Sequence, residues 1–336
     1  MDRKHLATAA VLCALAFTGP ALAQGAPSYK VVGHISMPDG GWDYSTFDAA
    51  GRMVYTARGP QVQGLNVETL EVTPKLAPAM GSHSPTPLPG GRILITNGGT
   101  NTVTIVSAKD GTQLASIPVG KGPDGAIYDP SSKLEFVADH NGGEVEFIDP
   151  KTQALAGQAV VGGTLEFLAA DGKGHVFVNV TDKNQIAEID IKTKAVTSYP
   201  LDGCQRPSGL AYASSAGVLI AACGNNVAAV IDAATGKTLQ TLPTGEGADA
   251  VIYDPMRKMA FVPCGRSAEL VVISAAAKDK IAVVQTLATM AGARSGAVDP
   301  KTGRLYLPAA LDVKAAAPGQ RRGMVPGTAE MLVVAP

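Results

Sequence analysis

The most informative stretch of the chain is residues 122–149, GPDGAIYDPSSKLEFVADHNGGEVEFID. It holds three short runs of β-branched and other apolar residues, at 126–128, 134–138 and 145–148. Turn residues, Asp-Pro and Asn-Gly-Gly among them, separate these runs, and no helical periodicity links them. Short runs bounded in this way predict antiparallel strands joined by tight turns.

The same pattern recurs along the chain with a period of about 40 to 45 residues, which is typical of the four-stranded blade of a β-propeller. Cutting after each terminal glycine gives seven units, at 34–81, 82–120, 121–163, 164–203, 204–245, 246–292 and 293–336. We therefore predict one all-β domain over residues 24–336, a seven-bladed β-propeller with four antiparallel strands per blade.

The two ends of the chain complement each other in this scheme. The last unit ends one strand short, and residues 29–37 read as a spare strand at the other terminus. We expect this N-terminal strand to complete the last blade, because a ring closed in that way has no free sheet edge.

The composition excludes several classes of protein. Of 336 residues, 46% are apolar and 17% are charged, so the chain is not intrinsically disordered. The 28 basic and 29 acidic residues give a net charge of −1, which argues against a protein that coats duplex DNA. The 38 glycines and 23 prolines supply turns and follow no fibrous period.

The N-terminus predicts export. Arg3 and Lys4 precede an apolar run at 6–17, and Ala21-Leu22-Ala23 supplies the small residues of a cleavage site, so residues 1–23 read as a secretory signal peptide. The apolar run is too short to cross a membrane. We expect the protein in the periplasm or outside the cell.

Three cysteines remain after removal of the signal peptide. Cys223 and Cys264 occupy equivalent positions in consecutive units, and Cys204 lies at the start of the innermost strand of the blade that contains Cys223. All three should therefore lie on one face. In an oxidising compartment we expect a disulfide between Cys204 and Cys223, with three free thiols as the alternative.

The phrases at 54–57, 94–97 and 136–139, each followed by a polar turn and a strand ending near Asp, resemble the YVTN repeats of YncE-like bacterial propellers. The resemblance implies an exported propeller and little about its chemistry, and we expect no cofactor. DNA binding is attributed to some of these proteins. Related seven-bladed folds serve as lactonases and as heavy chains of quinone-dependent dehydrogenases, so the resemblance does not choose a function.

The candidate functional residues lie on the loops of one face, where the innermost strands begin and where the second and third strands join. Four of them are candidates for a catalytic site: His83, His140, Asp124 and Glu166. Others are candidates for ligand binding: Trp42, Asp43, Arg206, Asp249, Arg266, Arg294, Arg321 and Arg322. Acids gather on the first four blades and arginines on the last three, which favours an anionic ligand.

Each candidate also has a plainer interpretation. Asp124 and Asp249 hold the same place in their units and are expected to bond turn amides. His83 and His140 are expected in solvent, and no metal site is predicted because no His-x-His or His-Glu-x-x-His spacing occurs. The alternative is that the two histidines meet across the channel mouth, where Asp43, Asp139 or Glu166 would orient them or complete a metal site. The long segment 311–327 is a candidate flap, with plain disorder as the alternative.

Two classes of function remain open. The one we favour is a binding or scaffold protein that uses its loop face and channel mouth for a protein partner or a small anionic ligand. The alternatives are a hydrolase, lactonase or lyase with a His, acid and Arg site in the channel, and a DNA-binding propeller. Single-stranded nucleic acid is disfavoured because the loops offer few aromatic residues for base stacking.

Overall fold

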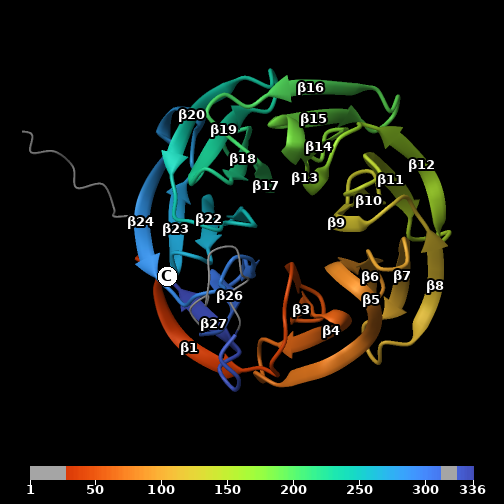
Figure 1. The fold of residues 1–336 in the computed structure, drawn as a ribbon, viewed down its shortest axis with the longest axis vertical. Helices are drawn as coiled ribbons and strands as arrows, with labels where there is room; N and C mark the ends of the chain where they lie inside the picture. Colours follow the sequence, from red (N-terminus) through yellow and green to blue (C-terminus); the bar gives the residue numbers. More distant parts are fainter. Residues whose placement is uncertain (1–27, 312–323) are drawn as a thin grey trace, which may run out of the picture.

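The computed structural model describes residues 28–311 and 324–336, and Figure 1 shows the sheets arranged in a circle around one axis. Almost all regular structure in these residues is β-strand, with two single-turn 3₁₀ helices, η1 (Thr181–Lys183) and η2 (Lys278–Lys280). No helix in the described ranges has the length and apolarity needed to cross a bilayer. The predicted signal peptide, residues 1–23, lies outside them.

Five of the sheets have four antiparallel strands each, and we number them as blades 3 to 7. Blade 3 contains β9 (Pro123–Asp129), β10 (Leu134–Asp139), β11 (Glu144–Asp149) and β12 (Ala154–Val160). Blade 4 contains β13 (Leu165–Ala170), β14 (His175–Val180), β15 (Gln185–Asp190) and β16 (Val196–Pro200). Blade 5 contains β17 (Pro207–Ala213), β18 (Val218–Cys223), β19 (Val227–Asp232) and β20 (Thr238–Pro243). Blade 6 contains β21 (Ile252–Asp254), β22 (Met259–Cys264), β23 (Glu269–Ser274) and β24 (Ala282–Ala288). Blade 7 contains β25 (Ala297–Asp299), β26 (Arg304–Ala309), β27 (Glu330–Ala335) and β1 (Lys30–Ser36).

Blades 1 and 2 form a single seven-stranded sheet. Its strands are β2 (Ser45–Asp48), β3 (Met53–Ala57), β4 (Gly59–Asn66), β5 (Val72–Leu88), β6 (Arg92–Asn97), β7 (Thr102–Ser107) and β8 (Gln113–Pro118). The first half of β5 pairs with β4 as the outermost strand of blade 1, and its second half pairs with β6 as the innermost strand of blade 2.

The sequence placed a boundary between these two blades after Gly81, and there the pairing of β5 changes from β4 to β6 although the strand itself continues. Strand β5 passes through Gly81 without interruption. The carbonyl oxygens of Met80 and Gly81 accept hydrogen bonds from the amides of Gly99 and Gly98, so backbone pairing continues across the predicted boundary.

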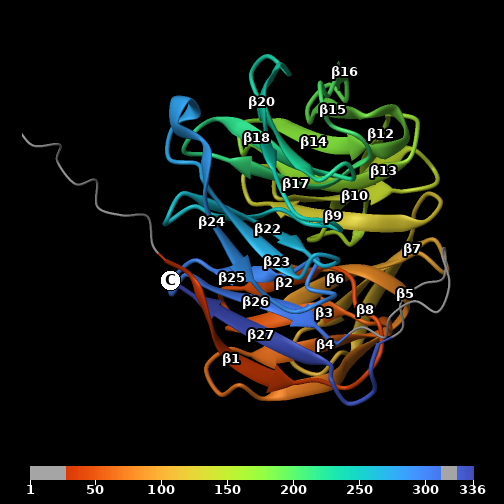
Figure 2. The same cartoon turned by 60° about the vertical axis from the view of Figure 1, so that its left-hand side comes forward.

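The N-terminal strand lies where the sequence expects it. Strand β1 pairs antiparallel with β27, from Lys30 opposite Ala335 to Ser36 opposite Glu330. Figure 2 shows the two strands side by side. The innermost strands also contact one another in succession around the axis, and the last of them, β25, contacts β2 of blade 1.

The hydrophobic core is divided among the seams between blades. Seven clusters of buried side chains each join two neighbouring blades, including a cluster between blade 7 and blade 1. Middle strands such as β18 and β22 are buried along their whole length, whereas the outermost strands β1 and β24 alternate between exposed and half-buried residues. The low charge content of the chain follows from sheets that are covered on both faces.

Candidate functional site

Seven polar side chains converge near the axis from six different blades. We call them the axial cluster: Asp43, His83, Asp124, His140, Glu166, Asp249 and Arg294. Six of them stand at or just before the beginning of an innermost strand, and His140 lies on the turn between β10 and β11. Because the fold repeats, equivalent positions of successive blades face the same centre, and the cluster is a consequence of that symmetry.

One part of the cluster is a hydrogen-bonded pair. The Nδ1 atom of His83 lies 2.8 Å from Oδ2 of Asp43 and 3.9 Å from Oδ2 of Asp124. The hydrogen bond to Asp43 stabilises the imidazolium and outweighs burial, so the pKa of His83 is raised to about 9.

A second part lies on the other side of Asp124. The Nδ1 atom of His140 is 3.8 Å from Oδ2 of Asp124 and 3.4 Å from Oε1 of Glu166. This nitrogen is buried and has no hydrogen-bond partner among the described residues. Asp124 therefore stands between two imidazoles, each of which presents Nδ1 to the same carboxylate oxygen.

The guanidinium of Arg294 joins the two remaining carboxylates. Its Nε lies 3.0 Å from Oδ2 of Asp249, and Nη2 lies 3.6 Å from Oδ1 of Asp43. Nη2 also donates to the carbonyl of Trp42 at 2.8 Å. Arg294 is therefore engaged within the protein, and its charge is shared between two acids.

Tyr44 lies beneath the acids and is almost fully buried. Its ring meets that of Phe167, on blade 4, with 4.5 Å between the centroids. Blades 1 and 4 are not neighbours in the ring, so this contact spans the centre and forms a floor. Burial, followed by the charges of Asp249, Glu166 and Asp124, raises the pKa of the Tyr44 hydroxyl well above its usual value.

The cluster carries more negative than positive charge. Four carboxylates face the Arg294 guanidinium and the His83 imidazole, whose raised pKa keeps it charged at pH 7, so ionisation of all four acids leaves two negative charges unbalanced. Burial and the neighbouring acids raise the pKa values of Asp124 and Glu166, although the charge of His83 lowers both. Crowded carboxylates of this kind are relieved by protons or by a bound cation.

The histidines therefore do not lie separately in solvent, as the sequence favoured. Asp124 and Asp249 also differ from the expected turn aspartates, because within the described ranges neither carboxylate accepts a backbone amide. The absence of a local metal-ligand spacing predicted no metal site. The structure nevertheless brings together two trios of suitable ligand atoms, Asp43 with His83 and Asp124, and Asp124 with His140 and Glu166.

The other predicted ligand residues lie apart from the cluster. Arg206 and Arg266 are exposed on the loops of blades 5 and 6. Trp42 is half-buried at the seam of blades 1 and 7, where Nε1 donates to the carbonyl of Gly292 at 3.2 Å. Arg321 and Arg322, with most of the segment 311–327, lie outside the described residues.

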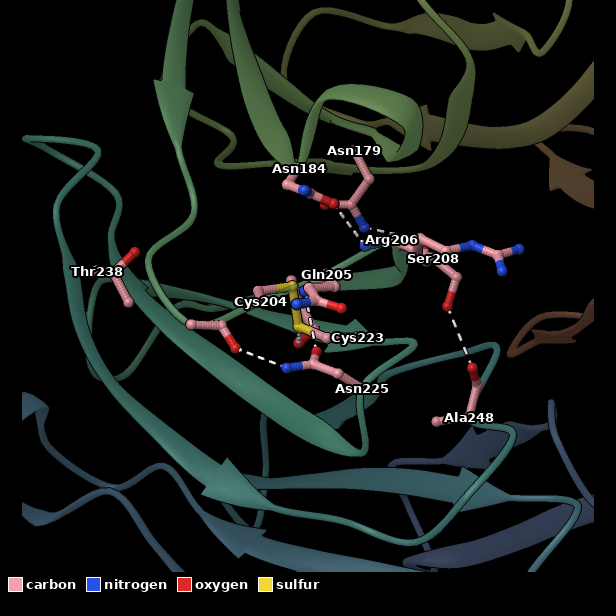
Figure 3. Close-up of a disulfide and its surroundings, with 12 residues drawn as sticks. Asn179, Asn184, Cys204, Gln205, Arg206, Ser208, Cys223, Asn225, Thr238 and Ala248 are labelled. Carbon is pink, nitrogen blue, oxygen red and sulfur yellow. Dashed lines mark hydrogen bonds between the residues drawn. A yellow bond between two sulfur atoms is a disulfide. The ribbon is translucent and has the colours of Figure 1, made fainter.

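A disulfide joins Cys204 to Cys223 and ties two loops of blade 5 together. Around it, the amides of Gln205 and Arg206 donate to the side chains of Asn225 and Asn184, at 2.9 and 2.7 Å. Figure 3 shows these contacts, with the Arg206 side chain extending away from the disulfide. The third cysteine, Cys264, has a free, buried thiol.

Sequence reasoning missed Tyr44 and Phe167. Each follows a predicted residue directly, Asp43 in one case and Glu166 in the other. That adjacency was the available signal, because side chains alternate in direction along an extended chain. Which of the two neighbours faces the axis, and which forms the floor, depends on the local backbone.

Comparison with known proteins establishes the β-propeller fold. No family profile and no curated protein sequence matches the chain. Among solved structures, the chain is similar to virginiamycin B lyase from Staphylococcus aureus, with a TM-score of 0.72 and 12% identity over 92% of this chain and 100% of that one. It is also similar to streptogramin B lyase, with a TM-score of 0.71 and 14% identity over 91% and 97%. A third similar structure is U3-55K, with a TM-score of 0.72 and 10% identity over 93% and 99%.

Proposed function

We propose that the chain is an exported, seven-bladed propeller of the YVTN type that binds a small, positively charged ligand at its axial cluster. One observation carries the proposal: four carboxylates converge on one guanidinium and two imidazoles. A positive group placed among them would relieve the repulsion between the acids, whereas an anion would add to it.

The charge of the proposed ligand is positive, whereas the sequence favoured an anionic ligand. That expectation relied on arginines near the channel mouth, yet Arg294 is already paired with Asp43 and Asp249. The same excess of acids argues against a nucleic acid at this site, since phosphates would meet carboxylates. Arg206 and Arg266 stay available on the neighbouring loops for other contacts.

Two features support export. Residues 1–23 have the pattern of a secretory signal peptide. A disulfide between Cys204 and Cys223 fits an oxidising compartment, where such bonds persist.

Pairing of β1 with β27, together with a core cluster at each of seven seams, supports the closed seven-bladed ring.

The charge of the ligand is tested by thermal unfolding in buffer containing EDTA. Small amines (putrescine, choline, arginine ethyl ester) and small acids (succinate, citrate) are added to the wild-type protein and to the double variant Asp124→Asn/Glu166→Gln. We expect amines to raise the melting temperature of the wild type only. The unliganded double variant should itself melt higher, because it lacks the crowded charges.

A matched control removes two exposed carboxylates away from the axis, Glu71→Gln and Asp202→Asn. It should respond to amines as the wild type does. Stabilisation by succinate or citrate that disappears in Arg206→Ala/Arg266→Ala would contradict the proposal and restore the anionic ligand.

A second candidate function is a hydrolase or lyase at the same cluster. The observation that favours it is the hydrogen bond from His83 to Asp43, an arrangement in which a carboxylate orients an imidazole for proton transfer. Two of the similar propellers are lyases by name. Turnover of lactones or of substrates for β-elimination should then be lost in His83→Gln and kept in His175→Gln.

A further inference from the structure

The imidazole of His140 has a polar atom that no group in the described part of the chain satisfies. Its Nδ1 atom is buried and lacks a hydrogen-bond partner in the described part of the chain. An unsatisfied buried polar atom costs about 1 to 3 kcal/mol. Carboxylate oxygens of Asp124 and Glu166 lie 3.8 and 3.4 Å from it, and neither contact has the geometry of a hydrogen bond.

These separations suit ligands that share one ion. Nitrogen and oxygen ligands lie about 2.0 to 2.2 Å from zinc, so two ligands of the same ion are separated by about 3.0 to 4.2 Å. The distances from His140 to Asp124 and Glu166 lie within that range. All three ligand atoms of this trio lie within 4.8 Å of one another.

In the other trio, Asp43 with His83 and Asp124, the imidazole already has a hydrogen-bond partner. The Nδ1–H of His83 donates to Oδ2 of Asp43 at 2.8 Å, which is an ordinary hydrogen-bond length. This pair needs no ion and lies on the far side of Asp124, 3.9 Å from its Oδ2. The two arms of the cluster therefore differ: among the described residues, the arm with His140 has a buried imidazole nitrogen without a hydrogen-bond partner, and the arm with His83 has none.

We propose that His140 Nδ1, Asp124 Oδ2 and Glu166 Oε1 bind one divalent transition-metal ion. The inference rests on the proposed cation-binding function and names the cation. The His83 and Asp43 pair flanks the site and positions Asp124. Three protein ligands leave further coordination positions for water or for a bound molecule.

The donor set also selects the metal. One imidazole nitrogen with two carboxylates suits zinc, manganese, iron or nickel, whereas calcium and magnesium prefer oxygen ligands alone. The side chains of His140 and Glu166 are 29% and 20% exposed, so the trio lies close to solvent although the Nδ1 atom of His140 is itself buried.

Calorimetric titration of the EDTA-treated, dialysed full chain with ZnCl₂ tests the proposal. We expect one equivalent of zinc to bind, manganese to bind more weakly, and calcium to give no comparable heat. His140→Gln, Asp124→Asn and Glu166→Gln should each weaken zinc binding at least about 100-fold, because each removes one of three ligands. Circular dichroism and melting curves establish that each variant folds. If one of the other variants fails to fold, the near-isosteric Glu166→Gln still tests the proposal.

Two control variants separate this site from other histidines. His175 lies on blade 4, 2.9 Å from Asp171 and 3.6 Å from Glu188, and forms a second cluster of histidine and acids. His175→Gln should bind zinc as the wild type does. His83→Gln should weaken zinc binding by about tenfold at most, the lower end of the range for residues that position a ligand, because His83 makes no direct hydrogen bond to Asp124.

Substitution with cobalt gives a readout that is independent of affinity. Visible absorption bands of bound Co²⁺ should appear in the wild type and in His175→Gln and be absent in His140→Gln. The proposal is overturned if the wild type takes up no zinc, or if zinc binding depends on His83 or His175 and not on His140. If zinc does not bind while amines still act through Asp124 and Glu166, the metal assignment fails and the proposed function stands. If neither binds, both fail.

Discussion

Gly111 lies in the turn after β7 at a point where a β-carbon has no room. Its backbone has a φ of +72°, and a β-carbon would lie 1.9 Å from the carbonyl oxygen of Leu76 and 3.0 Å from Cα of Ala77. Both obstacles belong to the backbone of β5, so no side-chain movement can relieve the contact. Gly217, in the turn after β17, has a similar φ of +64° but open space around it.

Comparing alanine substitutions at these two glycines separates the energetic cost of backbone strain from that of a steric clash. We expect Gly217→Ala to cost about 1 kcal/mol, the ordinary penalty of a left-handed alanine. Gly111→Ala should cost at least about 2 kcal/mol more, because β5 has to move away from the turn. Urea unfolding of both variants measures the difference, and equal destabilisation would show that the turn after β7 shifts freely.

Residue contacts at the axis could be predicted from the sequence only in part. The repeat indicated that Asp43, His83, Asp124 and Glu166 occupy equivalent places and so share a face. It did not indicate that their atoms meet, because contact depends on side-chain direction and on how far the loops reach inward. Trp42 illustrates the limit, since it turns into a seam between blades while Asp43, the next residue, faces the axis.

At the scale of single elements, one type of turn is used again and again. Asp129 and Asp299 each end the innermost strand of a blade, and each carboxylate accepts hydrogen bonds from the turn that follows. Four residues later comes a left-handed residue, Lys133 or Gly303, whose amide donates to the carbonyl of the same aspartate. The Asp-Pro phrases in the sequence predicted these turns. Their left-handed fourth position was not predicted, because lysine occurs there as well as glycine.

One such aspartate also links the first blade to the last. Asp299 is buried and accepts two hydrogen bonds from Arg52 of blade 1, at 2.7 and 3.1 Å. Burial raises the pKa of Asp299, but its hydrogen bonds with Arg52, Thr302 and Lys301 outweigh that effect and hold the pKa below its usual value. The bidentate pair therefore favours the ionised carboxylate.

We expect Arg52→Gln to lower the free energy of unfolding by about 2 kcal/mol at pH 7, because it leaves a buried carboxylate without its charged partner. A lowered pKa contributes stability above the ordinary aspartate value of about 4, and that stability is lost as the pH falls through the folded-state value. The gap between wild type and variant should therefore narrow on acidification.

Urea unfolding at pH 7 and at acid pH measures this gap, with Arg304→Gln as the control for loss of an exposed arginine on blade 7. A gap that stays constant or widens in acid would exclude Asp299 as the group responsible. The control variant should differ little from wild type at either pH.

At the scale of the whole molecule, the ring depends on cores that lie between blades. Each blade buries its two faces against different neighbours, so no blade has a complete core of its own. The repeat length and the missing last strand were sufficient to predict this arrangement. The sequence did not predict that blades 1 and 2 merge through the long strand β5, because Gly81 resembles the terminal glycines that end other units.

The seam at blade 7 holds the two ends of the chain together. Tyr29, just before β1, is 1% exposed, and its ring packs edge-on against Phe261 of blade 6 with 4.9 Å between the centroids. Its backbone exchanges hydrogen bonds with the side chain of Gln285 on β24. Residues 28–36 thus complete one sheet and cover the core between blades 6 and 7.

We therefore expect a chain that begins at Asp39 to lose cooperative unfolding, since it leaves the edge of β27 open and uncovers the core beneath Tyr29. A circular permutant that begins at Asp39 and carries residues 28–38 after Pro336, through a short glycine-rich linker, should recover it. The linker has little distance to cover, because Lys30 pairs with Ala335.

Melting curves and urea titrations of the parent, the truncated chain and the permutant test this expectation together. The permutant should unfold within about 1 kcal/mol of the parent, because it keeps every strand pair and changes only a surface connection. A truncated chain that melts like the parent would mean that three strands suffice for blade 7. A permutant no more stable than the truncated chain would mean that the N-terminal strand depends on its direct connection to blade 1. Closure of the ring would then follow from the order of the chain and not from the contacts of β1 with β27 and with the core between blades 6 and 7.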